Sequence, residues 1–146
     1  MTVPFLAAAV TAGGAWPCND GKAELGDAII LSAEDDAADT IVPRLLAAGA
    51  DTNRVHIVSA VRGDDGKGHR LFNLQADLGL LEETVRKVGT VRLVVIDPIS
   101  SYLGRGIESH NNTDVRGVLE PVSEIASRLR VAVVAVSHFN KNSSAT

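Results

Sequence analysis

Cysteine, aromatic residues and excess positive charge are all scarce in this chain of 146 residues. The single cysteine, Cys18, has no intrachain partner for a disulfide, which is compatible with a reducing compartment. Aromatic residues make up only 3% of the chain, so aliphatic side chains must form the core. The formal net charge of −4 gives no sign of a broad basic surface. Any contact with nucleic acid would therefore have to be local, in a loop or at a subunit interface.

Neither a membrane span nor a signal peptide is evident. The apolar stretch VPFLAAAV near the start is too short to cross a membrane, and no positive residue precedes it. We therefore expect a cytoplasmic protein without membrane contacts. The length and the hydrophobic content of 45% predict one domain, residues 1–146, with a substantial core.

Strand-like and helix-like patterns alternate along the chain, as in βαβ units with a parallel sheet. The continuous apolar run before Asp97 favours a central strand that is buried on both faces. We expect helices over residues 3–12, 35–48, 78–88 and 115–129, with Pro43 breaking the second and Pro121 kinking the last. The strands are expected in the spatial order 54–60, 28–34, 92–97 and 131–137.

Three of the expected strands end at or beside a polar residue, namely Glu34, Asp97 and His138. Parallel strands share a direction, so their carboxyl ends meet at one edge, where open α/β sheets bind ligands. Two acids and a histidine suit nucleotide hydrolysis. One carboxylate would hold the water shell of a magnesium ion, another would orient or deprotonate the attacking water, and the third group would sense the γ-phosphate. The alternative is that each residue merely faces solvent at the end of its strand.

Other polar residues form less specific patterns. His56 lies inside an expected strand and fits a partly buried histidine with a hydrogen-bond partner. Lys141, just past His138, is a candidate contact to a nucleotide phosphate and fits a lysine in a solvated loop equally well. The stretch GDDGKGH, residues 63–69, predicts a solvated loop between a strand and the next helix.

Three ordered segments, ILSAEDDAADTIVPRLLAAGADTNRVHIV, RLVVIDPISSYLG and VAVVAVSHFNK, resemble the RecA-like ATPases over nearly the whole chain. The similarity is closest to the hexameric replicative-helicase-like branch, which includes plasmid RepA-type replication proteins and phage or prophage genes. The resemblance implies a three-layer α/β fold, a parallel β-sheet flanked by helices, that binds ATP and magnesium. It also implies that Asp97 is the Walker B aspartate, which contacts magnesium through water. Glu34 would then be the catalytic glutamate and His138 the γ-phosphate sensor.

The phosphate loop of that family does not occur in these 146 residues. The pattern G-x-x-x-x-G-K-[ST], whose backbone N–H groups and lysine cradle the phosphates, is absent. We therefore expect a single partial RecA-like domain that lacks its first, phosphate-loop strand, with the loop encoded directly before Met1. This chain alone should hydrolyse ATP poorly or not at all.

Two functions from different classes stay open at this point. The chain is either the nucleotide-hydrolysis core of a helicase-like ATPase, or a non-catalytic interaction module that assembles through the edge of its sheet. A missing phosphate-loop strand would leave the strand at residues 131–136 with an open edge, which invites a second copy and predicts a homo-oligomer. The resemblance also places a pore loop for single-stranded nucleic acid at residues 104–114. Nucleotide affinity discriminates between the two functions.

Overall fold

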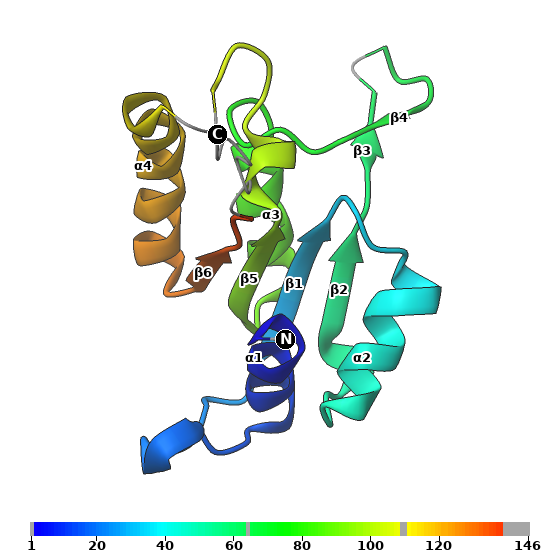
Figure 1. Cartoon of the computed structure of the whole chain (residues 1–146), viewed down its shortest axis with the longest axis vertical. Helices are drawn as coiled ribbons and strands as arrows, with labels where there is room; N and C mark the ends of the chain where they lie inside the picture. Colours follow the sequence, from blue (N-terminus) through cyan, green and yellow to red (C-terminus); the bar gives the residue numbers. More distant parts are fainter. Residues whose placement is uncertain (1, 64, 109–110, 139–146) are drawn as a thin grey trace, which may run out of the picture.

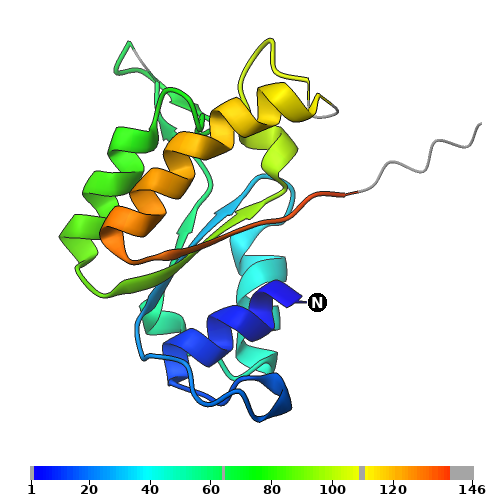
Figure 2. The ribbon, with the colours of Figure 1, turned by 90° about the vertical axis from the view of Figure 1, so that its left-hand side faces the viewer.

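A four-stranded parallel sheet forms the centre of the computed structural model, which describes residues 2–63, 65–108 and 111–138. The strands follow the order β2 (Val55–Val58), β1 (Asp27–Ser32), β5 (Val91–Asp97) and β6 (Ala132–Ala135). Helices α1 (Thr2–Ala12) and α2 (Val42–Ala47) cover one face, and α3 (Leu78–Val88) and α4 (Asn112–Leu129) cover the other (Figure 1). Figure 2 shows the three layers from the side. The predicted three-layer α/β fold and its strand order are confirmed.

The two central strands, β1 and β5, separate two apolar cores. They pair in parallel, and the pairing ends where Ser32 lies beside Asp97. Ile29 and Leu31 belong to the core under α3 and α4, whereas Ile30 belongs to the core under α1 and α2. A strand that is buried on both faces has no position for an alternating polar residue, which explains the continuous apolar runs in the sequence.

Helix boundaries follow local signals that the sequence carries. Asn111 caps α4, because its side chain accepts a hydrogen bond from the Thr113 backbone N–H, and α3 ends at Gly89 in the left-handed conformation (φ 80°). The predicted break at Pro43 is wrong, because a π-helix (Ala37–Ile41) runs directly into α2 and both Ile41 and Val42 have right-handed helical backbone angles. Pro43 is tolerated because it lies in the first turn of α2. Pro121 lies inside α4 without ending it. Among the described residues, no helix combines the length and the apolar character that crossing a membrane requires.

The expectation of only a solvated loop at residues 63–69 is incomplete. Two short strands, β3 (Val61–Arg62) and β4 (His69–Arg70), pair antiparallel on either side of that loop and form a hairpin. Strands of two residues are too short to show an alternating pattern, so the sequence did not reveal them. Arg70 ties the hairpin to the start of α3, because its guanidinium donates two hydrogen bonds to Asp77, at 2.6 and 2.9 Å.

Candidate functional site

Asp97 is the last residue of β5 and lies at the carboxyl edge of the sheet. Val95, two residues earlier, packs in the core under α1 and α2, and Asp97 lines a small cavity on the same side. The Asp97 side chain is 32% exposed. Its backbone carbonyl accepts a hydrogen bond from the Ala33 N–H at 3.3 Å, which ties β5 to the segment that follows β1. The strand therefore presents this carboxylate to solvent from a fixed backbone.

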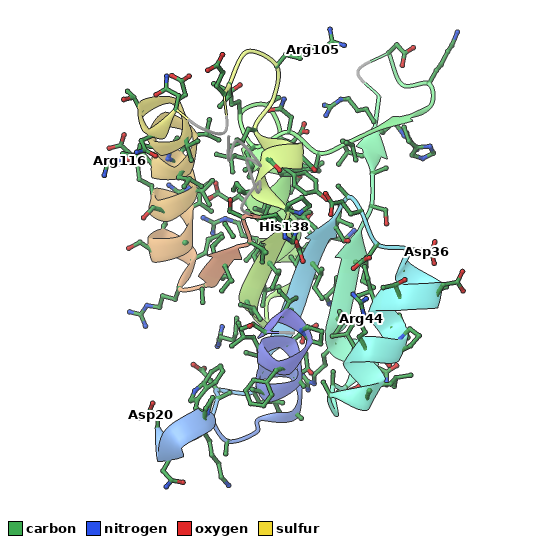
Figure 3. All side chains as sticks on the ribbon, in the orientation of Figure 1. Asp20, Asp36, Arg44, Arg105, Arg116 and His138 are labelled. Atoms are coloured by element: carbon green, nitrogen blue, oxygen red, sulfur yellow. The ribbon has the colours of Figure 1, made fainter. Side chains whose placement is uncertain are left out.

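Among the predicted site residues that the structure describes, His138 is the one that contacts Asp97. Its Nε2 atom lies 3.5 Å from Asp97 Oδ1, which is an ion-pair distance longer than an ordinary hydrogen bond. Backbone hydrogen bonds position the approach to His138: the Val136 N–H donates to the Ile96 carbonyl, and the Ile99 N–H donates to the Val136 carbonyl. The pairing of β6 thus continues beyond Ala135 toward the histidine. Figure 3 shows His138 at the end of the sheet toward which the strands point.

Glu34 lies at the same edge but apart from this pair. Strand β1 ends at Ser32, so Glu34 follows the register partner of Asp97 by two residues. Its side chain is exposed, and among the described residues its carboxylate has no hydrogen-bond or ion-pair partner. The structure therefore brings Asp97 and His138 together and leaves Glu34 as an exposed carboxylate two residues beyond the end of β1.

A cavity of about 50 Å³ opens beside Asp97, between β1 and the first turn of α1. Val3 and Pro4 from α1 line it together with Ser32. An ion pair between Arg44 Nη1 and Asp35 Oδ2, 3.0 Å apart, belongs to the same wall.

Sequence reasoning missed Ser32 and Arg44. The sequence does contain a signal for Ser32, because it is the first polar residue after the apolar run of β1; its register partner is Asp97. No local pattern indicates Arg44. It meets Asp35 nine residues away only because a π-helix and the start of α2 intervene.

The negative charge of Asp97 also acts on Tyr102, which lies in the core on the other face of the sheet. Burial, and secondarily the negative charge of Asp97, raise the pKa of the Tyr102 hydroxyl to about 12. That hydroxyl is buried and has no hydrogen-bond partner among the described residues. Tyr102 therefore stays neutral at physiological pH.

The donor set at this edge suits magnesium better than a metal with many protein ligands. The described part of the chain contains no group of three or more His, Cys, Asp or Glu side chains that would hold a metal ion. Magnesium keeps much of its water and is bound through one or two carboxylates and substrate phosphates. Asp97, partly exposed beside the Ser32 hydroxyl, fits that requirement.

Two further predicted contacts are only partly tested by the structure. Lys141 lies outside the described residues. The expected loop at residues 104–114 is shorter at its end, because residues 112–114 form the first turn of α4. Its described first part carries an exposed Arg105, which Figure 3 shows at the same carboxyl edge of the molecule.

A family model described as an AAA domain matches residues 4–144, which is nearly the whole chain. No curated protein matches the chain at a significant level.

Proposed function

The chain belongs to the AAA domain family of ATPases, and from this premise we propose that it is the nucleotide-hydrolysis core of a helicase-like, RecA-type ATPase. The finer assignment is to the replicative-helicase-like branch that includes plasmid RepA-type proteins. The segments around Glu34, Asp97 and His138 support that assignment.

One observation carries the proposal: the first turn of α1 and Asp97 line the same cavity. The amino end of a helix attracts phosphate, because its free N–H groups and the helix dipole present positive charge. Helix α1 has eleven residues and directs that end at the space beside Asp97. A polyphosphate bound there would lie between a positive helix end and a carboxylate that holds magnesium.

Each residue then has a distinct role. Asp97 would hold magnesium through the water shell of the ion, and the ion would supply positive charge against the phosphate oxygens. Glu34 is exposed and has no partner within the described ranges, so its carboxylate would accept a proton from the attacking water. His138 is 63% exposed and lies 3.5 Å from Asp97, so it is placed to contact the terminal phosphate and to couple that contact to Asp97. Lys141 is a further proposed phosphate contact.

We expect weak nucleotide binding and very slow turnover from these 146 residues alone. They supply the three polar side chains but contain no G-x-x-x-x-G-K-[ST] pattern. The lysine and the row of backbone N–H groups in that loop provide most of the electrostatic stabilisation of the transferred phosphoryl group.

The test joins a strand and a G-x-x-x-x-G-K-[ST] loop to the chain before Met1 and compares magnesium-dependent ATP binding and turnover of both proteins. Turnover should rise at least about 100-fold in the joined protein, and Asp97→Asn or Glu34→Gln should abolish the gain. Asp39→Asn and Glu83→Gln, at exposed positions on the π-helix and on α3, are the matched controls. Rapid turnover by the 146 residues alone, or an active Asp97→Asn variant, would contradict the proposal.

A second function has its own supporting observation at β6. This strand is last in the order of the described sheet and has β5 as its neighbour on one side only. Its residues are exposed or half-buried, and a cavity of about 340 Å³ beside it is lined partly by Trp16, Leu93 and Val134. An open strand edge pairs readily with another chain, so assembly of a homo-oligomer through β6 is the alternative to catalysis.

Sedimentation separates this alternative from the first proposal. An assembly through β6 should appear as a concentration-dependent oligomer that Val134→Lys dissociates, because a charge on an edge strand opposes pairing. A chain that stays monomeric at high concentration would contradict it. A stable oligomer that binds no nucleotide, even with the added loop, would favour it over catalysis.

Single-stranded nucleic acid is the proposed partner of the loop after β5. The exposed Arg105 offers one local cation in a chain of net negative charge, so binding should be weak and sensitive to salt. Arg105→Ala should lower the affinity for a labelled single-stranded oligonucleotide in an anisotropy titration, whereas Arg86→Ala on α3 should not. An unchanged affinity in Arg105→Ala would contradict this role.

A further inference from the structure

Two side-chain amides lie against the loop that carries Arg105. A β-carbon placed on Gly104 would lie 2.7 Å from Asn73 Nδ2 and 3.0 Å from Gln75 Oε1. The first distance is too short for a real β-carbon, so only glycine lets the loop approach the amides this closely. Gly104 also has a left-handed backbone (φ 90°), which a side chain would strain. Asn73 and Gln75 therefore lie next to the backbone that bears Arg105, at the carboxyl edge of the sheet (Figure 3).

The core anchors the backbone on either side of the two amides. The Leu74 N–H donates a hydrogen bond to the Tyr102 carbonyl at 2.8 Å, which joins this segment to the turn before the loop. The rings of Phe72 and Tyr102 pack edge to face, with 6.5 Å between their centres. Phe72, Leu74 and Tyr102 are all buried. The backbone that bears Asn73 and Gln75 is therefore fixed relative to the start of the loop.

Both amides keep hydrogen-bonding groups that a ligand could use. Asn73 Oδ1 accepts hydrogen bonds from the backbone N–H groups of Gln75, at 2.8 Å, and Ala76, at 3.1 Å, which orients this side chain. Its Nδ2 has no hydrogen-bond partner among the described residues. The Gln75 side chain is exposed and makes no hydrogen bond within the described ranges. Gln75 therefore presents a donor beside an acceptor, and Asn73 adds a second donor.

A donor beside an acceptor complements the edge of a nucleic-acid base. Adenine fits this pattern well, because its N6 amino group lies beside the ring acceptor N7, and the amide of Asn or Gln can bind both atoms at once. Bases in a single strand have no pairing partner, so their edges are open to such contacts. The exposed Arg105 offers positive charge to a phosphate. The amides and Arg105 thus match the two parts of one nucleotide.

We propose that Gln75, aided by Asn73, hydrogen-bonds to a base of a single-stranded nucleic acid whose phosphate contacts Arg105, and that the site prefers adenine. The inference rests on the proposed nucleic-acid role of the loop after β5. It adds sequence preference to that role, because a cation on a phosphate contacts every sequence alike. Gln75 is then the residue that determines specificity, and Arg105 supplies affinity for any single strand.

The experiment titrates the 146-residue chain with three short DNA strands and follows binding by NMR. One strand is a dT tract, and in the others the central dT is replaced by dA or by a purine nucleotide that lacks the N6 amino group. Gln75 is the only glutamine in the chain, so selective labelling of glutamine gives one identifiable pair of side-chain NH₂ signals. The strand with dA should shift these signals and bind about fivefold more tightly than the other two.

Three variants assign the preference to its residue. Gln75→Ala should lower the affinity for the dA strand to that for the dT tract and leave the dT tract nearly unchanged. Arg105→Ala should weaken all three strands alike and keep the preference. Asn53→Ala removes an exposed amide at the amino edge of the sheet and is the matched control, with no expected change. Thermal melts verify that each variant folds.

The outcomes separate the contact to the base from the contact to the phosphate. If the wild type binds all three strands equally, or if Gln75→Ala keeps the preference for dA, the base contact is wrong and the nucleic-acid role of Arg105 stands. Equal weakening of all three strands in Gln75→Ala would also overturn it, since Gln75 would then act on the backbone of the strand. If no strand binds, the nucleic-acid role of the loop and the base contact both fail.

Discussion

The two edges of the sheet each carry an aspartate beside a histidine, and the two pairs are built differently. At the amino edge, Asp27 is only 11% exposed, and its carboxylate accepts hydrogen bonds from Arg54 at 3.1 Å and Thr90 at 3.0 Å. His56 Nε2 lies 2.8 Å from the same carboxylate. At the carboxyl edge, the Asp97 side chain is 32% exposed, and its one ion-pair partner in the described part of the chain is His138 Nε2 at 3.5 Å.

This difference separates a structural pair from one that is available to a ligand. Burial alone would raise the pKa of Asp27, but the hydrogen bonds from His56, Thr90 and Arg54 and the charge of His56 outweigh it and lower that pKa. The protein has thus satisfied the Asp27 carboxylate internally, and the group stabilises the fold. Asp97 keeps most of its hydrogen-bonding capacity free. A carboxylate of that kind at the ligand-binding edge of a parallel sheet is a functional candidate.

The largest expected effect comes from removing the amino-edge carboxylate. Asp27→Ala should lower the free energy of unfolding by roughly 3 kcal/mol, because Arg54, His56 and Thr90 lose their shared acceptor. The matched change Asp97→Ala should cost less than about 1 kcal/mol, since that carboxylate has one long and exposed contact. Urea denaturation followed by circular dichroism measures both. Equal losses at the two edges would show that the pairs do not differ as described.

Acid should lower the free energy of unfolding, because it protonates Asp27 at the amino edge of the sheet. Because the pKa of Asp27 is lowered below its ordinary 3.8, its stabilisation is present above that value and is lost as the pH falls through the lower folded-state pKa. Hydrogen bonds from Arg70 and Arg86 likewise lower the pKa values of Asp77 and Glu82. These two carboxylates therefore add to the fall in the free energy of unfolding at acid pH in every variant.

Urea midpoints between about pH 6 and pH 3 test this prediction. Asp27→Asn should flatten the fall in the free energy of unfolding with falling pH. If the urea midpoint falls equally steeply with pH in the wild type and in Asp27→Asn, another group controls the loss of stability in acid.

The two histidines should respond in opposite ways to the same substitution. His56→Gln loses a 2.8 Å bond to Asp27 and should cost about 1 kcal/mol of stability without affecting nucleotide binding. His138→Gln should change stability by less than about 0.5 kcal/mol, because the residue is exposed, yet it should weaken ATP binding in the protein with the added loop. Paired denaturation and binding measurements give both values. A stable His56→Gln variant with impaired binding would reverse the assignment of the two pairs.

The smallest expected effect concerns Tyr102. Its buried hydroxyl has no hydrogen-bond partner among the described residues, so Tyr102→Phe should change stability by less than about 1 kcal/mol near neutral pH, toward greater stability. The raised pKa means that the wild type loses stability as the pH rises from about 10, the unfolded value, to about 12. Tyr102→Phe should remove that loss.

Tyrosinate absorbance sharpens the comparison between edges, because Tyr102 is the only tyrosine in the chain. Asp97→Asn should lower the Tyr102 pKa, since the negative charge of Asp97 helps to raise it. Asp27→Asn, at the far edge, should leave the pKa where it is. If the Tyr102 pKa is the same in Asp97→Asn as in the wild type, burial alone raises it.

The elements whose signals are local were predictable from the sequence. The apolar run that ends at Asp97 determined a central strand, because a strand covered on both faces needs apolar residues at every position. The stripe of apolar residues over 78–88 and Gly89 determined the bounds of α3, since a helix periodicity and a left-handed stop act within a few residues. The gathering of Glu34, Asp97 and His138 at one edge followed from strand direction alone.

Only the tertiary structure decided which of these side chains meet. His56 reaches Asp27 across 29 residues and Thr90 reaches it across 63, and both contacts depend on the register of β1 against its neighbours. The Arg44–Asp35 pair depends on the π-helix between them, and the contact between His138 and Asp97 depends on where β6 pairs with β5. Periodicity and capping encode the elements because they act along the chain. Register, helix phase and cavity shape arise from packing between distant segments, so the sequence alone did not determine them.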